Sequence, residues 1–287
     1  MSRNIIDAII TIVQQPNHKL VKYTSSGRST NRMNVMGDPL EEYVKNMFAN
    51  TFGVTDPVAR MIAISNTFSY LGNDTTPPDA MLKGGNLGDA IEVKKTNTFA
   101  TIQLNSSHPK SKLHSNSSMI TNDCKSCETW TERDMIYVMG QVSGEYVKTL
   151  CMVYGMDYCA NNSVYESLKD KVTTGINDIP DIPWAETNEL GRVNRVDPLG
   201  ITYLRVRGMW FIQHPLKVFD YIYTPDSNKE FNLMVLINEE KISQLDNYNT
   251  LVDFSRTNPS LKISDVQIKN PNNPAQLKSA KLITFSK

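Results

Sequence analysis

Apolar side chains near the N-terminus recur at helical spacing, from Ile5 to Val13. Asn4 has the short polar side chain that caps a helix, and Pro16 is placed to stop one. The pattern therefore predicts a helix over residues 4–14. The polar residues that follow, rich in serine, asparagine and glycine, predict a loop or mobile arm.

A second helix is predicted where Asp38 can act as N-cap and Pro39 as the first helical residue. The apolar side chains that follow have the spacing of one buried helix face: Leu40, Val44, Met47 and Phe48. Gly53 is expected to end this helix. The mostly apolar residues 58–70 predict a further element, either helix or strand.

After residue 77 the pattern becomes that of strands. A short apolar segment, PPDAML, is followed by the turn KGGNLG and by DAIEVKK, in which polar and apolar residues alternate. Further strands are predicted over residues 98–104, 135–142, 146–155, 200–212 and 231–237, and helices over 122–132 and 161–172. Residues 177–200 are expected to be irregular, and the last 40 residues are expected to form loops and short elements. Helices around a mixed sheet predict one α/β or α+β domain over residues 1–287.

The composition narrows the class of protein. In 287 residues, 30 basic side chains balance 30 acidic ones, so bulk positive charge does not hold this protein on nucleic acid. The 40% hydrophobic content excludes a disordered chain. No apolar run reaches the length of a membrane span and no signal peptide is evident, so we expect a cytoplasmic protein without membrane contact.

The cysteines offer a zinc hypothesis. Cys124 and Cys127 have zinc-like spacing, but Cys151 and Cys159 make a poor second half-site. Free cytosolic thiols are the favoured interpretation, with zinc as the alternative.

The sequence Pro78-Asp79, then Glu92-Val93-Lys94, is the strongest candidate for chemistry. Alternation puts Glu92 and Lys94 on one strand face. If the two segments form a hairpin about the glycine-rich turn, Asp79 lies across from Glu92. Asp89 is a rival, but its parity turns it away from Glu92 unless a bulge intervenes. A surface hairpin with an ordinary Glu–Lys pair is the plain alternative.

Two facing carboxylates repel each other, and a divalent cation removes that penalty. Oxygen ligands of this kind suit Mg²⁺, and Lys94 is placed to stabilise a phosphate or activate water. On the second helix, Glu41 lies at the edge of the apolar stripe, where it either looks into the site or stays exposed to solvent.

Two other segments carry groups that contact DNA. Ser106, Ser107, Lys110 and Lys112 follow a predicted strand, in a stretch that could also be a solvated loop. Arg205 and Arg207 are expected to share one face of the strand over 200–212, with Arg192 and Arg195 just upstream. Such arginines bind guanine or phosphate at two points, or they form a structural ion-pair ladder. Tyr203, Trp210 and Phe211 are expected in the core.

The hairpin PPDAML…GGNLGDAIEVKK resembles the active site of PD-(D/E)xK nucleases. Blocks between about residues 30 and 215 resemble the NgoPII-like family of type II restriction endonucleases: GDPLEEYVKNMF, FSYLGN, PPDAMLKGG, LNSSHPKSKL, MVYGMDYCA and DPLGITYLRVRGMW. The C-terminal quarter is weakly matched. The resemblance implies a nuclease-like mixed central sheet flanked by helices, with a catalytic hairpin at about 77–104 and recognition segments at about 105–120 and 190–215.

The resemblance also implies an activity. It points to a Mg²⁺-dependent homodimer that cuts double-stranded DNA at the palindrome GGCC to leave blunt ends with 5′-phosphates, in a prokaryotic cell that holds a cognate DNA methyltransferase. Asp79, Glu92 and Lys94 match the nuclease motif, with the Val93 carbonyl as a further metal ligand, and Glu41 matches the helix acid. A repair or structure-specific nuclease, or a DNA-binding module with a nuclease-like fold, are the alternatives.

Overall fold

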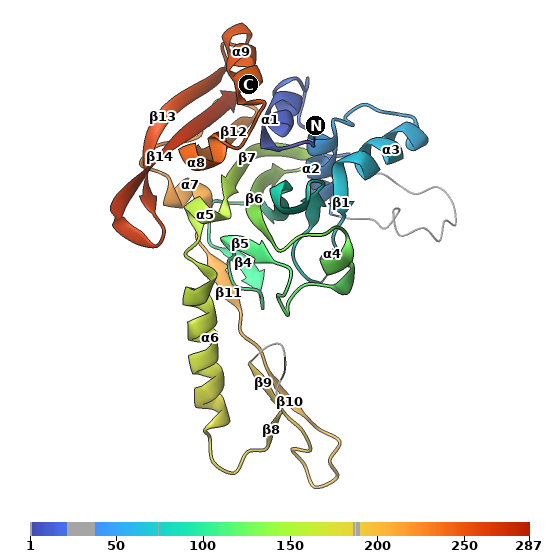
Figure 1. The fold of residues 1–287 in the computed structure, drawn as a ribbon, viewed down its shortest axis with the longest axis vertical. Helices are drawn as coiled ribbons and strands as arrows, with labels where there is room; N and C mark the ends of the chain where they lie inside the picture. Colours follow the sequence, from blue (N-terminus) through green and yellow to red (C-terminus); the bar gives the residue numbers. More distant parts are fainter. Residues whose placement is uncertain (1, 22–37, 74, 186, 188–189) are drawn as a thin grey trace.

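The computed structural model describes residues 2–21, 38–73, 75–185, 187 and 190–287 (Figure 1). Residues 22–37, most of the predicted N-terminal loop, lie outside the described part. Among the described residues, no helix combines the length and apolar character needed to cross a bilayer.

A mixed nine-stranded sheet forms the centre of the molecule. Strands β3 and β6 run parallel, as do β7 and β12, and the other neighbours are antiparallel. In spatial order the strands are β1 (Phe68–Tyr70), β2 (Ala80–Leu82), β3 (Ala90–Thr96), β6 (Glu132–Ser143), β7 (Tyr146–Tyr154), β12 (Asn232–Asn238), β14 (Asn273–Ser286) and β13 (Leu261–Asn270), with β5 (Lys112–His114) beside β6.

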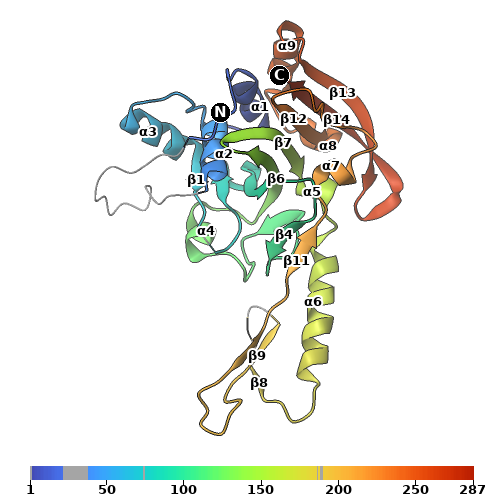
Figure 2. The same ribbon diagram turned by 180° about the vertical axis from the view of Figure 1, so that it is seen from behind.

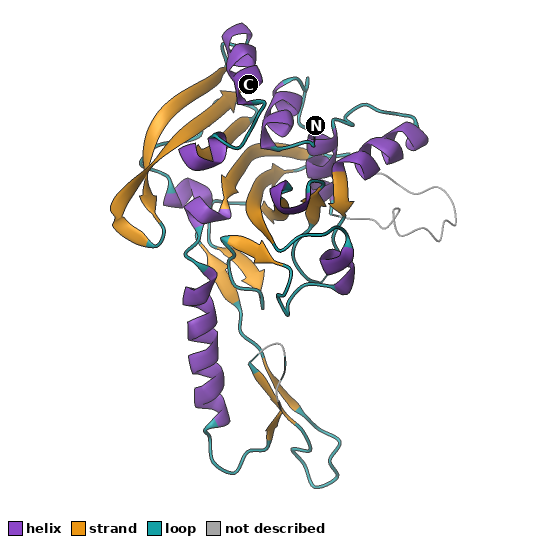
Figure 3. Ribbon diagram, viewed as in Figure 1, coloured by secondary structure: helices purple, strands orange, loops and turns teal. Residues whose placement is uncertain are grey.

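Helices cover both faces of this sheet (Figure 3). The helices of the described residues are α1 (Ile5–Val13), α2 (Pro39–Ala49), α3 (Pro57–Thr67), α4 (Asn122–Ser126), α5 (Gly155–Tyr158), α6 (Asn162–Asn177), α7 (Pro215–Val218), α8 (Glu239–Ile242) and α9 (Tyr248–Thr257), of which α6 extends away from the sheet. Helices α1 and α2 share one apolar cluster with Ile91 and Val93, and a second cluster lies on the other face around Ala90 and Tyr137. The architecture is the mixed α/β fold that the sequence predicted.

The first two helices begin where their caps predicted. The Asn4 side chain accepts a hydrogen bond from the backbone of Ile6, and Asp38 accepts one from Leu40. The second helix ends earlier than predicted, at Asn50, which takes the left-handed conformation that ends many helices. Residues 58–70 contain both elements left open by the sequence, because α3 runs directly into β1.

An arm extends from the body of the molecule (Figures 1 and 2). We define it as α6 together with the three-stranded sheet of β8 (Trp184–Ala185), β9 (Gly191–Val193) and β10 (Leu204–Val206). At its base, β11 (Trp210–Ile212) pairs with β4 (Ile102–Asn105). The prediction of one strand over residues 200–212 is therefore wrong, because the segment contributes β10 and β11 to different sheets.

The prediction of core aromatics in this region is wrong for two of the three residues. Tyr203 is 58% exposed, because the thin arm has no second layer to cover it, and Phe211 is 55% exposed on β11 at the base of the arm. Trp210 is half-buried against Tyr165 and His108.

The prediction for the C-terminus is also wrong. Instead of loops, β13 and β14 form a long hairpin that completes the central sheet. Its strands read as loops because much of the hairpin is solvent-exposed and therefore polar. Two smaller differences concern lengths, because α4 is shorter than predicted and α6 is longer. A third is that the strand β5 lies inside the segment predicted to be a polar loop.

Candidate active site

The hairpin of β2 and β3 fixes the candidate catalytic residues. Its register pairs Ala80 with Ile91 and Met81 with Ala90, and the same register continues to place Asp79 opposite Glu92. The Asp79 amide also donates to the Ile91 carbonyl, at 2.9 Å. The hairpin predicted from the sequence is present, with its turn at the expected glycines.

Asp79, Glu92 and Lys94 form one charged cluster. The Lys94 Nζ donates to Glu92 Oε1 at 2.5 Å and lies 3.9 Å from Asp79 Oδ2. Asp79 Oδ2 also accepts the backbone N–H of Val93 at 2.6 Å, which holds this carboxyl against the neighbouring strand. The predicted trio is thus brought together at the end of β2 and along β3.

Burial raises the pKa of two acids at this site, Asp79 and Glu41. Burial, with the nearby Glu92 carboxylate, raises the pKa of Asp79 to about 7. Burial, with Asp79, likewise raises the pKa of Glu41 on α2 to about 7. Glu41 therefore lies close enough to Asp79 for their charges to interact, so this edge of α2 faces the hairpin.

Lysines offset part of this negative charge. Burial alone would lower the pKa of Lys94, but the carboxylates of Glu92, Asp79 and Glu41 outweigh it and raise the pKa. Lys45, which the sequence analysis missed, lies one helical turn from Glu41, with its Nζ 3.9 Å from Glu41 Oε2. It lowers the pKa of Asp79, opposing the burial effect. Its spacing of four residues from Glu41 was the available signal.

The donor set suits a divalent cation that prefers oxygen. Glu92 Oε2 is buried and has no hydrogen-bond partner among the described residues, which is costly for a carboxylate without a cation. Asp79 and the Val93 carbonyl supply further oxygens beside it. Within the described ranges no group of three or more His, Cys, Asp or Glu is placed to hold a metal. Two carboxylates are enough for Mg²⁺, which completes its shell with water and phosphate.

Asp89, the rival acid, lies elsewhere. Its side chain is buried and accepts hydrogen bonds from Lys241 Nζ at 2.8 Å and from the Tyr154 hydroxyl at 3.0 Å. Lys241 also pairs with Asp134, at 2.8 Å. Asp89 therefore belongs to a closed ion-pair network, on the face of β3 that its parity predicted.

The two candidate DNA-binding segments meet at the base of the arm. The Arg207 Nη2 donates to the Ser106 hydroxyl at 3.4 Å, and β11 pairs with β4 just beside Ser106. Ser107 lines a small cavity that also contacts Glu92. Segments that are about 100 residues apart in the chain thus form one surface next to the hairpin.

The other candidates are more dispersed. Lys110 is buried, whereas Lys112 pairs with Glu132 at 2.7 Å. On the arm, Arg192 and Arg205 are cross-strand neighbours, and the Arg192 guanidinium lies 4.1 Å from the centre of the Tyr203 ring. Arg195 sits further out, in a turn with positive φ. The expectation that Arg205 and Arg207 share one strand face is wrong, because β10 ends at Val206.

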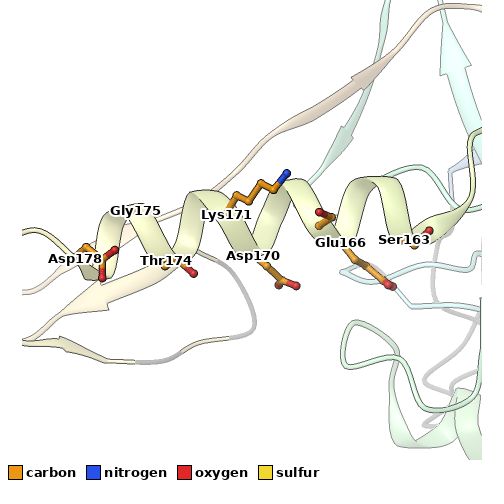
Figure 4. A pocket seen from close by; sticks show the side chains of 8 residues that line it. Ser163, Glu166, Asp170, Lys171, Thr174, Gly175 and Asp178 are labelled. Atoms are coloured by element: carbon orange, nitrogen blue, oxygen red, sulfur yellow. The ribbon is translucent and has the colours of Figure 1, made fainter.

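A second hollow lies along the outer face of α6 (Figure 4). Its side chains are polar, and the acids Glu166, Asp170 and Asp178 outnumber the one lysine, Lys171. Negative charge disfavours DNA phosphates, so this hollow is not part of the candidate site. The four cysteines are free thiols, and Cys124, Cys151 and Cys159 are buried in the second apolar cluster.

Comparison with known proteins decides the family. The model of the NgoPII restriction endonuclease family matches residues 3–269. The chain belongs to the NgoPII restriction endonuclease family. It is 50% identical over 284 residues to the type II restriction enzyme NgoPII of Neisseria gonorrhoeae, a match that covers 98% of this chain and 99% of that relative. No solved structure shows a significant match.

Membership in the NgoPII family confirms the resemblance found in the sequence and extends it. The match runs well into the C-terminal quarter, which the sequence analysis found weakly matched. The family match includes β13 as far as residue 269 and ends before β14. Enzymes of this type act on double-stranded DNA and generally need a divalent metal ion.

Proposed function

We propose that this protein is a Mg²⁺-dependent type II restriction endonuclease that hydrolyses phosphodiester bonds of double-stranded DNA at GGCC. The sequence resemblance implies blunt cleavage between G and C, with 5′-phosphate products. The observation that carries the chemistry is the close approach of Lys94 to both Glu92 and Asp79. Family membership carries the substrate class.

In this proposal Asp79, Glu92 and the Val93 carbonyl hold the metal. When bound, Mg²⁺ would supply positive charge to the scissile phosphate and lower the pKa of water. Its arrival would favour ionised Asp79, whose raised pKa otherwise favours the protonated form. Glu41, which interacts electrostatically with Asp79, is a further acid that either contacts the attacking water or adjusts the pKa of Asp79.

Lys94 has the role of fixing charge at the reacting phosphate. Its Nζ is held by Glu92 Oε1 and the Val93 carbonyl, so it is oriented before DNA arrives. A preorganised cation in a partly buried site stabilises negative charge that develops in the transition state. It can also orient the attacking water along the line of the bond that breaks.

DNA would be gripped at the base of the arm and along it. Ser106, Ser107, Lys110 and Lys112 are the candidates from the body, and Arg192, Arg195, Arg205 and Arg207 those from the arm. The contact between Arg207 and Ser106 supports a single binding surface. Arginine can bind guanine or phosphate at two points, which suits a target rich in G·C pairs.

A palindromic target calls for a two-fold homodimer, with one site on each strand. The exposed apolar stripe of α6 supports this part of the proposal: Val164, Leu168 and Val172 are 55%, 52% and 40% exposed. They lie four residues apart and so follow one helix face. The enzyme is proposed to act in the cytoplasm of a prokaryotic cell, with a cognate DNA methyltransferase as its functional partner.

The test is digestion of a long, fully sequenced, unmethylated DNA with the purified protein, in Mg²⁺ and in EDTA. The expected result is discrete fragments only in Mg²⁺, with blunt ends inside GGCC. Discrete fragments at another sequence would keep the mechanism and reject the target. A smear would favour a repair-type nuclease, and binding without cleavage would favour a DNA-binding module.

A further inference from the structure

A small cavity lies against Glu92, on the strand face opposite the α1–α2 cluster. Its lining includes Glu92, Lys110, Ser107 and His108. The cavity therefore joins the candidate metal site to the loop of residues 105–112, which we call the bridge loop. Lys110 in this lining is only 4% exposed, and lysine side chains are rarely buried to this degree unless they are paired with an opposite charge.

The bridge loop is fixed next to Glu92 by one tyrosine. Tyr137 is the partner of Glu92 across β3 and β6, so the two side chains lie side by side on one face. The backbone N–H of Lys110 donates to the Tyr137 oxygen at 2.7 Å, and the Tyr137 hydroxyl donates to the Lys110 carbonyl at 3.3 Å. The backbone that carries Lys110 is therefore tied directly to the strand beside Glu92.

The arm holds the same loop from its other side. Asn162, the first residue of α6, accepts a hydrogen bond from the Ser111 amide at 3.2 Å and donates one to the Lys112 carbonyl at 3.0 Å. A Cβ at Gly155 would lie 2.4 Å from the Lys110 carbonyl oxygen, so glycine is required there for the loop to pack this closely. Both flanks of Lys110 are thus held in place.

The charges in the cavity are opposite and incompletely paired. Glu92 Oε1 is bound by Lys94, while Glu92 Oε2 is buried without a hydrogen-bond partner among the described residues. Burial lowers the pKa of Lys110, and the Glu92 carboxylate opposes that effect. A cation in such a cavity attracts a carboxylate more strongly than it would in water.

We propose that Lys110 is a positioning residue of the metal site, which orients and partly neutralises the Glu92 carboxylate from within the cavity. This inference rests on the proposed function, in which Glu92 binds a divalent cation. The inference predicts the direction in which cation affinity changes when Lys110 is replaced. A positive charge near Glu92 weakens cation binding, so removing the charge tightens it, while Glu92 loses the orientation needed for rapid cleavage.

The test uses Lys110→Met in the full-length protein, with two readouts. Binding of Mn²⁺ without DNA is measured from the electron paramagnetic resonance signal of the free ion, and is expected to tighten about threefold. Single-turnover cleavage in Mg²⁺ is expected to slow about tenfold or more. Lys110→Arg, which keeps the charge, should bind Mn²⁺ like the parent protein. General damage to the site would weaken Mn²⁺ binding instead.

Lys95→Met is the matched control, because it removes a lysine charge from β3 itself at an exposed position. It should leave Mn²⁺ binding unchanged. Unchanged or weaker Mn²⁺ binding in Lys110→Met would overturn the inference. If the methionine variant does not fold, Mn²⁺ binding is measured in Lys110→Gln, and the same outcome applies. Failure of the proposed function looks different: the parent would then bind no Mn²⁺, or Asp79→Asn would bind it as well as the parent.

Discussion

The catalytic hairpin and the arm are built on opposite principles. In the hairpin, Ala80 and Ile91 are buried, Asp79 is held by the Val93 amide of the adjoining strand, and Lys94 is held by Glu92 on its own strand. In the arm, no side chain of the 16-residue helix α6 is buried, and Leu199 at the tip is 81% exposed. The first region is packed within the central sheet, whereas the second is largely exposed to solvent.

This difference separates the two tasks that the proposed function requires. Chemistry needs reacting groups held in place before the substrate arrives, which a buried hairpin in a central sheet provides. Recognition of a DNA duplex needs a surface that extends beyond the body of the protein, and the arm provides one (Figure 1). Contacts made on binding can offset the entropy cost of ordering exposed side chains. Substitutions in the hairpin should therefore change rates, and substitutions in the arm should change affinities and assembly.

The largest effect is expected from the hairpin. Asp79→Asn removes a metal-binding charge but keeps the size of the side chain, so cleavage should slow by about 10³-fold or more. Binding to GGCC-containing DNA in Ca²⁺-free buffer should change by less than about threefold, because the arm is untouched. Single-turnover cleavage and fluorescence anisotropy measure the two quantities.

Asp89→Asn is the matched control for this change. It alters an acid in the same hairpin, but one that is enclosed by Lys241 and Tyr154. Removing one partner of a buried pair costs about 3–5 kcal/mol of stability. The variant should melt at a lower temperature and, where it remains folded, cleave at a rate near that of the parent. Equal loss of cleavage in both folded variants would contradict the assignment of Asp79.

The second effect concerns assembly through α6. Leu168→Glu puts a charge in the middle of the exposed apolar stripe, which should weaken the proposed dimer about 30-fold or more. Sedimentation equilibrium over a range of protein concentrations measures this change. Ile62→Glu is the control, because Ile62 on α3 is also an exposed apolar residue, at 51%. A dimer broken by Ile62→Glu and not by Leu168→Glu would move the interface to α3.

The contrast also explains what the sequence could predict. In the hairpin, strand alternation and the glycine turn were sufficient to place Asp79 opposite Glu92, because local register and core burial agree there. Caps at Asn4 and Asp38 were equally local signals, and the structure confirms both. The fold class followed from these elements.

The arm could not be predicted from the sequence, because the strand β11 at its base pairs with a segment far away in the chain. The strand predicted over 200–212 divides where Arg207 leaves β10, and this division depends on pairing with β4, about 100 residues earlier. Tyr203 was expected in the core because it is aromatic, but a thin arm has no core to receive it. Lys45 was missed although its spacing of four residues from Glu41 was a local signal, because its effect on Asp79 becomes visible only in the fold.

A smaller effect is expected from the arm arginines. Arg207→Ala removes a guanidinium at the junction with Ser106, so DNA binding should weaken about tenfold, and the salt dependence of binding should become less steep by about one unit. Cleavage at saturating DNA should stay near the parent rate. Arg256→Ala, on α9 at the far end from the arm, is the control (Figure 1). The same loss of affinity in both variants would mean that the arm is not the binding surface.

The smallest effect is a dependence of stability on pH in the metal-free protein. The pKa of Asp79 is raised from 3.8 to about 7, mainly by burial. Between these values the folded protein keeps a proton that the unfolded chain has lost, so stability present at low pH is lost as the pH rises through about 7. Asp79→Asn cannot ionise and escapes this loss. Relative to the parent, its Tm should therefore rise by a few degrees between pH 5 and pH 8, for about 1–2 kcal/mol.

Calorimetric melts in EDTA at both pH values measure this difference, and Ca²⁺ supplies the control. A cation bound beside Asp79 offsets the cost of ionising this acid, so Ca²⁺ should raise the Tm of the parent at pH 8 more than at pH 5. It should do little for Asp79→Asn. If parent and variant instead keep a constant Tm difference across this range, then Asp79 is already ionised in the metal-free fold. Cation binding would then not be needed to ionise Asp79.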